Sequence, residues 1–246
     1  MALAPDEDRP PPPATYSSAM SEPPVLLVHG FASSFERNWR QPGWVDLLKD
    51  AGREVIGVDL LGHGRAPRPH DPAAYASLED HVAGAIPDGS QVDAIGFSLG
   101  ARVLLRVAAR APERFAHIVT GGVGANLFRT DDPEPMARAV EGSSEASEPL
   151  GRAFARFAAD GDNDPKALAA CLRRPTEPLS ADELGRIRCP VLVVLGTADF
   201  AGPADPLVAA LPDVRLVTLA GVDHLGTPMH MRFIDAALEF LGALPT

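Results

Sequence analysis

The chain has 246 residues, a formal net charge of −11 and a hydrophobic fraction of 46%, so it is long enough to bury one sizeable core. This acidic net charge argues against nucleic-acid binding, which uses a basic face, and also against docking to anionic lipid or to an acidic carrier protein. No uninterrupted apolar run reaches the roughly 18 residues of a membrane-spanning helix. Two cysteines, Cys171 and Cys189, cannot form a disulfide framework, and we expect both to be free thiols.

Residues 1–23 have the composition of a tail. They contain the run Pro10–Pro13 and few aliphatic side chains, so they cannot bury enough apolar surface to offset their ordering entropy, and we expect them to be disordered. The acidic start and the lack of an apolar segment differ from a secretory signal, which predicts a cytoplasmic protein. Met20 would serve as an alternative start, with the residues before it as an extension.

From residue 24 the sequence alternates between short apolar runs and amphipathic segments. The apolar runs predict strands at 24–30, 54–60, 91–97, 115–123, 190–196 and 214–220. The amphipathic segments predict helices at 43–52, 77–86, 99–111, 204–211 and 229–243, with Ser77 as the N-cap of the second. Strands that alternate with helices in this way predict an α/β fold with a mostly parallel, doubly wound sheet.

The alternation is interrupted between residues 125 and 187. This stretch has no strand pattern but contains helical patches at 150–159 and 165–174. It is too long for a simple connection, so we expect a helical cap that covers the functional edge of the sheet. The chain is therefore expected to form one domain, 24–246, with an insertion.

The segment IGFSLG at 95–100 is a G-x-S-x-G element between a predicted strand and a predicted helix. In that context a sharp turn raises the Ser98 hydroxyl above the carboxyl edge of the sheet. Gly96 and Gly100 fit the close approach of strand and helix, where a Cβ has no room. The alternative interpretation is that Ser98 merely caps the helix.

A serine nucleophile needs a base, and the base needs a carboxylate. Among the seven histidines, His224 lies in the loop after the last predicted strand, from which it can reach the sheet edge. Asp199 lies just past the strand 190–196 and is favoured as its partner over Asp223 and Asp205. The resulting chain order, serine then aspartate then histidine, is the one expected with a nucleophile elbow.

The oxyanion hole requires two backbone N–H groups aimed at the developing charge. We expect one from Leu99, which follows the nucleophile at a helix N-terminus. The second is expected from Phe31, in the loop HGFASS that follows the first predicted strand. His29 and His63 are interpreted as residues that order loops. A metal site built from His29, His63 and Asp59 is a weak alternative, because these residues lack ligand spacing.

Together these motifs resemble the α/β-hydrolase superfamily, in particular its capped serine esterases, haloperoxidases and C–C hydrolases. The resemblance covers about residues 24–244 and rests on His29-Gly30-Phe31, the segment 59–64 (DLLGHG), the elbow 96–100, Asp199 and His224. It implies a Ser-His-Asp hydrolase without metal or organic cofactor, with the insertion as its cap. Such proteins usually have a two-stranded hairpin before the first strand predicted here, and we expect it to be missing.

The predicted function is hydrolysis of a small to medium, mostly apolar carboxylic ester through an acyl-enzyme. A thioesterase or a C–C bond hydrolase would use the same triad, and a non-catalytic ligand-binding member of the fold remains an alternative. Serine at the elbow excludes the haloalkane dehalogenases and epoxide hydrolases of this fold, which use aspartate. The sequence does not decide between a monomer and a dimer.

The predicted substrate pocket is apolar. Its candidate residues are Phe97, Leu127, Phe128, Phe154, Phe157 and Leu225. Arginines 102, 106, 110 and 114 recur every four residues on the elbow helix and predict a solvated, salt-bridged stripe. In a second interpretation Arg102, one turn after Ser98, meets a substrate carboxylate. Acids outnumber bases in the insertion, which argues against an acyl-carrier-protein substrate.

Overall fold

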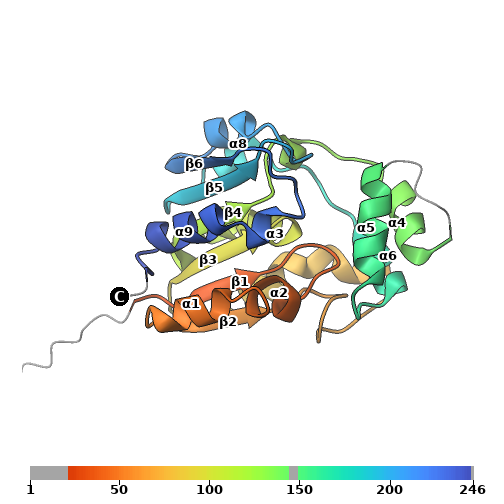
Figure 1. The fold of residues 1–246 in the computed structure, drawn as a ribbon, viewed down its shortest axis with the longest axis horizontal. Helices are drawn as coiled ribbons and strands as arrows, with labels where there is room; N and C mark the ends of the chain where they lie inside the picture. Colours follow the sequence, from red (N-terminus) through yellow and green to blue (C-terminus); the bar gives the residue numbers. More distant parts are fainter. Residues whose placement is uncertain (1–21, 144–148, 245–246) are drawn as a thin grey trace, which may run out of the picture.

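A single six-stranded parallel sheet forms the centre of the molecule in the computed structural model, which describes residues 22–143 and 149–244 (Figure 1). The strands are β1 (Val25–Val28), β2 (Val55–Val58), β3 (Val92–Phe97), β4 (Phe115–Gly121), β5 (Val191–Gly196) and β6 (Val214–Leu219). Their order is β2-β1-β3-β4-β5-β6, and every neighbouring pair is parallel. All six predicted strands are confirmed, each within three residues at its ends.

The strands alternate their side chains between two cores because successive residues point to opposite faces of a sheet. On β1, Val25 and Leu27 join the core cluster on one face, and Leu26 and Val28 join the cluster on the other. All four are fully buried. This double burial explains why the inner strands read as continuous apolar runs rather than as alternating ones.

Helices cover both faces of the sheet, as predicted. One face packs against α1 (Trp44–Asp50) and α9 (Met231–Phe240), and the other against α2 (Leu78–Ala83), α3 (Leu99–Arg110), α7 (Ala181–Leu184) and α8 (Asp205–Ala210). Ser77 occupies the N-cap position of α2, as predicted, but its side chain makes no capping hydrogen bond. Its backbone instead continues from a short 3-10 helix, Pro72–Ser77, directly into α2.

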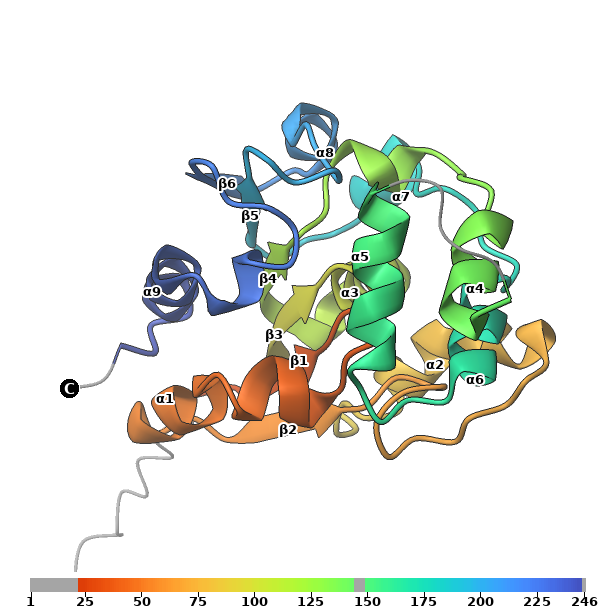
Figure 2. The same cartoon turned by 45° about the vertical axis from the view of Figure 1, so that its right-hand side comes forward.

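The chain between β4 and β5 supplies three further helices: α4 (Glu134–Glu141), α5 (Pro149–Ala159) and α6 (Pro165–Leu172). Figures 1 and 2 show them as one group beside one end of the sheet. Here we call these three the cap helices. Their shared apolar cluster of Val140, Ala158 and Leu168 also includes Ala32 from the loop after β1. The cap helices are therefore packed directly onto that loop.

The arginines of α3 differ from the predicted solvated stripe. Arg106 is only 9% exposed; it lies near Glu79 and Glu183, and it also donates to the carbonyl of Glu177. Arg102 donates to the carbonyl oxygen of Asn126 at 2.8 Å, and burial lowers its pKa to about 10. The chain between β4 and β5 covers the side of α3 that carries Arg102 and Arg106. Arg110 remains exposed to solvent.

Several remaining expectations concern the ends of the chain and its thiols. The predicted tail lies almost entirely outside the described residues, and within those residues no strand precedes β1. Cys171 and Cys189 are both buried free thiols, as expected. None of the helices in the described part of the chain is long and apolar enough to cross a membrane.

Candidate active site

Ser98 lies on the sharp turn between β3 and α3. Its backbone φ of 52° and ψ of −111° fall in a strained region for a residue with a side chain. The Ser98 side chain makes no capping hydrogen bond to α3, so the interpretation of Ser98 as a helix cap is wrong. The turn is held in place by close packing: a Cβ on Gly96 would lie 2.8 Å from the Ala101 nitrogen, and one on Gly100 would lie 2.6 Å from the His29 oxygen.

A chain of hydrogen bonds connects Ser98, His224 and Asp199. The Ser98 Oγ lies 2.9 Å from the His224 Nε2, and the His224 Nδ1 lies 2.9 Å and 3.0 Å from the two carboxylate oxygens of Asp199. An ionised carboxylate only accepts, so Nδ1 of the neutral ring carries the hydrogen and Nε2 accepts from the serine hydroxyl. The three residues come from turns after β3, β5 and β6, which parallel strands bring to one edge.

His224 is buried among aromatic side chains. The ring centroid of Phe200 lies 4.4 Å from that of His224, and the Phe97 ring centroid lies 4.9 Å away. The His224 side chain is 4% exposed and the Asp199 side chain is fully covered. Asp199 also accepts the Ala201 N–H at 2.9 Å, which fixes the carboxylate in place. Of the alternatives, Asp223 accepts the Gly226 N–H instead.

Of the two predicted oxyanion donors, Leu99 directly follows Ser98 at the start of α3, and Phe31 lines the same cavity as Ser98. Neither N–H has a hydrogen-bond partner among the described residues. The Gly30 carbonyl accepts from Nδ1 of His29 at 2.8 Å and from the Ser33 N–H at 3.3 Å. Because a trans peptide points its C=O and N–H in opposite directions, fixing that carbonyl also fixes the direction of the Phe31 N–H.

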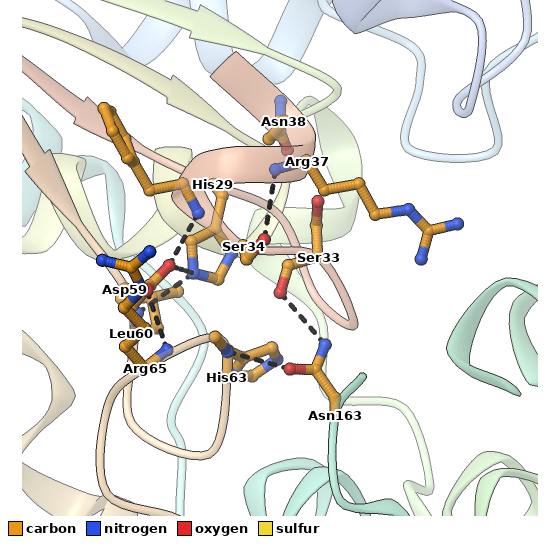
Figure 3. Close-up of polar contacts among 12 residues, drawn as sticks. His29, Ser33, Ser34, Arg37, Asn38, Asp59, Leu60, His63, Arg65 and Asn163 are labelled. Atoms are coloured by element: carbon orange, nitrogen blue, oxygen red, sulfur yellow. Dashed lines mark hydrogen bonds and ion pairs between the residues drawn. The ribbon is translucent and has the colours of Figure 1, made fainter. Parts of the chain in front are cut away.

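His29 and Asp59 form hydrogen bonds that order the loops around the site, and they do not form a metal site. The His29 Nε2 accepts from the Leu60 N–H at 3.0 Å, so both ring nitrogens are used, and burial lowers the pKa of His29 to about 4. Asp59 accepts the N–H groups of Phe35 and Arg65 (Figure 3). No cluster of three or more His, Cys, Asp or Glu side chains in the described part of the chain is arranged to hold a metal ion.

A cavity of about 340 Å³ opens beside Ser98 and His224. Of the predicted pocket residues, Phe97, Phe154, Phe157 and Leu225 line it. Leu127 and Phe128 do not line it: Leu127 is fully buried in the main core, and Phe128 packs against that core. They are among the first residues of the insertion after β4, and they pack into the main core instead of lining the cavity.

The structure adds cavity residues that the sequence reasoning missed. They are Ser33, Arg37, Asn38, Gln41, Pro42, Pro228 and Met229. Most come from the loop after β1, whose residues Glu36–Arg40 form a π-helical turn. Asn38 accepts the Gly30 N–H through its Oδ1 at 3.1 Å. Asn38 is buried, so its amide oxygen needs a partner, but the segment ERNWR alone does not show that burial.

Comparison with known proteins identifies the family. Residues 25–239 match the family described as "Alpha/beta hydrolase family", and the chain belongs to that family. This confirms the resemblance inferred from the motifs.

One relative covers most of the chain. The pimeloyl-[acyl-carrier protein] methyl ester esterase of Neisseria meningitidis serogroup B is 30% identical over an alignment of 232 positions, and the match covers 81% of this chain and 85% of the esterase. The biotin biosynthesis bifunctional protein of Cellvibrio japonicus is 31% identical over an alignment of 166 positions, and the match covers 63% of this chain but only 30% of that longer protein. The chain therefore matches one part of the bifunctional protein.

A solved structure has the same fold. The 2-hydroxy-6-oxo-6-phenylhexa-2,4-dienoate hydrolase of a Rhodococcus species superimposes with a TM-score of 0.68 and 19% sequence identity. The match covers 90% of each chain. At this identity the similarity describes the sheet and its helices, and it says nothing about substrate.

Proposed function

We propose that the protein is a carboxylesterase that works through an acyl-enzyme on Ser98. The observation that carries the proposal is the unbroken chain of hydrogen bonds from Asp199 through His224 to Ser98, with each heavy-atom distance between 2.9 and 3.0 Å. These distances are within the reach that proton transfer needs. The chain of bonds ends at a cavity, so a bound carbonyl has access to the serine oxygen.

The first half of the reaction acylates the serine. Oγ of Ser98 attacks the ester carbonyl while Nε2 of His224 takes the hydroxyl proton. Asp199 stabilises the resulting imidazolium and keeps the proton on Nδ1 during the approach. The N–H groups of Phe31 and Leu99 receive the oxyanion, and His224 then protonates the leaving alkoxide.

The second half hydrolyses the acyl-enzyme. His224, now neutral again, takes a proton from water as the water oxygen attacks the acyl carbonyl. The same two N–H groups receive the second oxyanion, and collapse of the intermediate returns the proton from His224 to Ser98. The strained turn at Ser98 supports both halves, because it holds Oγ in one place without help from the substrate.

The substrate class follows from the cavity and from the relative. A volume of about 340 Å³ and walls that include Phe97, Phe154 and Leu225 suit a small to medium acyl or alkyl group with apolar character. The relative that matches 81% of the chain is named for the hydrolysis of a methyl ester. That name favours ester cleavage over thioester or C–C bond cleavage on the same three residues.

The test is the Ser98→Ala variant, assayed with p-nitrophenyl esters from acetate to octanoate beside acyl-CoA thioesters. We expect kcat for the preferred ester to fall by about 10⁴-fold or more, since the nucleophile is lost. A fluorophosphonate probe should label the wild-type protein and not the variant. Ser90→Ala, which removes a hydroxyl away from the cavity, is the matched control. Full ester turnover by Ser98→Ala would contradict the proposal.

Labelling of Ser98 without turnover of any ester or thioester would favour a ligand-binding protein instead. A thioester preference of tenfold or more over the matched ester would replace the carboxylesterase assignment with a thioesterase. Both outcomes retain Ser98 as the reactive residue, so the panel separates the chemistry of the serine from the identity of the substrate.

A further inference from the structure

The cavity beside Ser98 has a charge that the rest of the molecule does not predict. The chain as a whole carries a formal net charge of −11. Yet the described residues that line this cavity include Arg37 as their single Lys or Arg, and they include no Asp or Glu. The wall of this cavity is therefore positively charged, although the chain as a whole is acidic.

Arg37 is held in a defined position by the cap helices. Its Nη1 donates to the carbonyl oxygen of Phe157 at 3.1 Å, and its Cζ lies 4.1 Å from the centre of the Phe157 ring. A guanidinium has five N–H donors, and this contact uses one of them. The cation–π contact orients the planar group without neutralising its charge. Arg37 is thus arranged in advance, with donors left for another partner.

Among the residues that the structure describes, no acid forms an ion pair with Arg37. Four acids, Glu36, Asp59, Asp160 and Asp162, line a neighbouring hollow that Arg37 also borders. In the described part of the chain none of them forms an ion pair with Arg37 within 4.0 Å. Glu36 pairs with Arg40 at 3.1 Å, and Asp59 accepts two backbone N–H groups. Figure 3 shows the Arg37 side chain extending away from Asp59.

We propose that Arg37 binds a carboxylate carried by the substrate, so that the preferred substrates are esters with a second, ionised carboxyl group. Half-esters of dicarboxylic acids are the simplest members of this class. The proposal rests on the proposed function, because it names the substrate class of that same site. A guanidinium matches the two oxygens of a carboxylate in a paired, planar contact. The apolar walls then accommodate the carbon chain between the carboxylate and the ester.

The sequence had pointed to another arginine for this role. Arg102 is occupied by the Asn126 carbonyl and does not line the cavity, so it is not available to a substrate. Arg37 lies instead on the π-helical turn after β1, and Gln41 directly follows that turn. Both residues line the cavity, so its wall includes a guanidinium and an amide.

The experiment compares matched substrates in the wild-type protein and in Arg37→Gln. The substrates are monomethyl esters of dicarboxylic acids from succinate to suberate, and methyl esters of neutral acids whose branched ends copy the carboxylate shape. Methanol release gives kcat and KM. In the wild-type protein we expect kcat/KM for the best half-ester to exceed that of its neutral match by about tenfold or more.

Arg37→Gln should lower kcat/KM for the half-ester by about tenfold, mostly through KM, and leave the neutral ester within about twofold. Arg37→Lys should restore part of the preference, because it keeps the charge and loses the paired geometry. Arg40→Gln is the control: Arg40 lies on the same turn, pairs with Glu36 and does not line the cavity. It should leave both substrates unchanged.

Two results would overturn the proposal. The first is a wild-type protein without preference for the half-ester at any chain length. The second is an equal loss on both substrates in Arg37→Gln, which would mean that Arg37 acts only by holding Phe157 and the cap helices. The proposed function fails separately, if Ser98→Ala still hydrolyses the neutral ester. If neutral esters are cleaved through Ser98 without a carboxylate preference, only the present inference fails.

Discussion

Replacing Gly100 by alanine tests how tightly the serine turn is packed against the sheet. A Cβ at this position would overlap the Val28 carbonyl oxygen and would lie 2.6 Å from the His29 oxygen. Both contacts are with backbone atoms, which cannot rotate away as a side chain does. Helix α3 or strand β1 must therefore shift by up to about 1 Å to restore ordinary contact distances.

The magnitude follows from that shift. Overpacking of a well-packed core costs about 1–3 kcal/mol, and a clash with backbone belongs at the upper end, at about 3 kcal/mol. For a domain of this size that loss lowers Tm by about 6–12 °C. Activity should fall further, because a displacement of about 1 Å at the reacting group costs about 100-fold. Ser98 and the Leu99 N–H both belong to the displaced turn.

Thermal unfolding and ester kinetics on the same preparation measure the two effects together. Gly185→Ala is the matched control, because Gly185 has a helical φ of −63° and an added Cβ would come no closer than 3.3 Å to its neighbours. We expect that control to stay within about 1 kcal/mol of the wild type. A Gly100→Ala protein with unchanged Tm and unchanged kcat/KM would refute the packing argument.

Two further predictions concern buried charge. His29 and His63 are fully buried, and burial lowers their pKa values to about 4 and about 3. Below about pH 6.5 these two histidines bind protons in the unfolded chain but not in the folded chain. The free energy of unfolding therefore falls as the pH drops. His63→Gln should reduce the slope of unfolding free energy between about pH 6.5 and 4 by up to about 1.4 kcal/mol per pH unit, measured by urea titration, and an unchanged slope would contradict this. Arg53→Met removes the buried ion-pair partner of Asp93, whose side chain is 2% exposed, and leaves the contact with the more exposed His117; it should cost about 3–5 kcal/mol. As the control, Arg110→Met removes the exposed pair with Asp80 and should lower the free energy of unfolding by less than about 1 kcal/mol. Equal losses of stability in the two variants would contradict the argument that burial makes the Arg53–Asp93 pair important.

The sheet was predictable because burial on two faces leaves a direct record in the sequence. A strand such as β5 (Val191–Gly196) is buried at every residue, so its whole length must be apolar. The contacts of Ser98, His224 and Asp199 follow from the same logic, because residues that follow parallel strands meet at one edge. Neither argument depends on how the insertion between β4 and β5 folds.

The cavity wall could not be predicted in the same way. Its composition depends on which part of the insertion reaches the cavity, and Leu127 and Phe157 have equally apolar side chains. Leu127 fills the core because it follows β4 closely, whereas Phe157 lies on α5 and reaches the cavity. The arginines of α3 show the same limit: a single helix pattern predicts solvation, but the inserted chain covers Arg102 and Arg106.

Strain in the backbone is concentrated next to the two proposed oxyanion donors. Among the described residues other than glycine, Ala32 and Ser98 are the two with positive φ, at 58° and 52°. Ala32 follows Phe31, and Ser98 precedes Leu99, so each strained residue adjoins one donor. Such conformations persist where the surroundings enforce them. The elbow packing enforces Ser98, but the apolar cluster with Val140, Ala158 and Leu168 of the cap helices encloses Ala32.

The directions of the two N–H groups are therefore fixed by different parts of the molecule. The Leu99 N–H is fixed by the contact between α3 and β1, which belongs to the sheet core. The Phe31 N–H depends on the loop after β1, which is held from one side by His29 and from the other by the cap helices. Arg37 lies on the same loop and contacts Phe157 of the cap. A substrate carboxylate at Arg37 would therefore bind to the segment that also carries one oxyanion donor, so that substrate recognition and the geometry of the first donor depend on the same few residues.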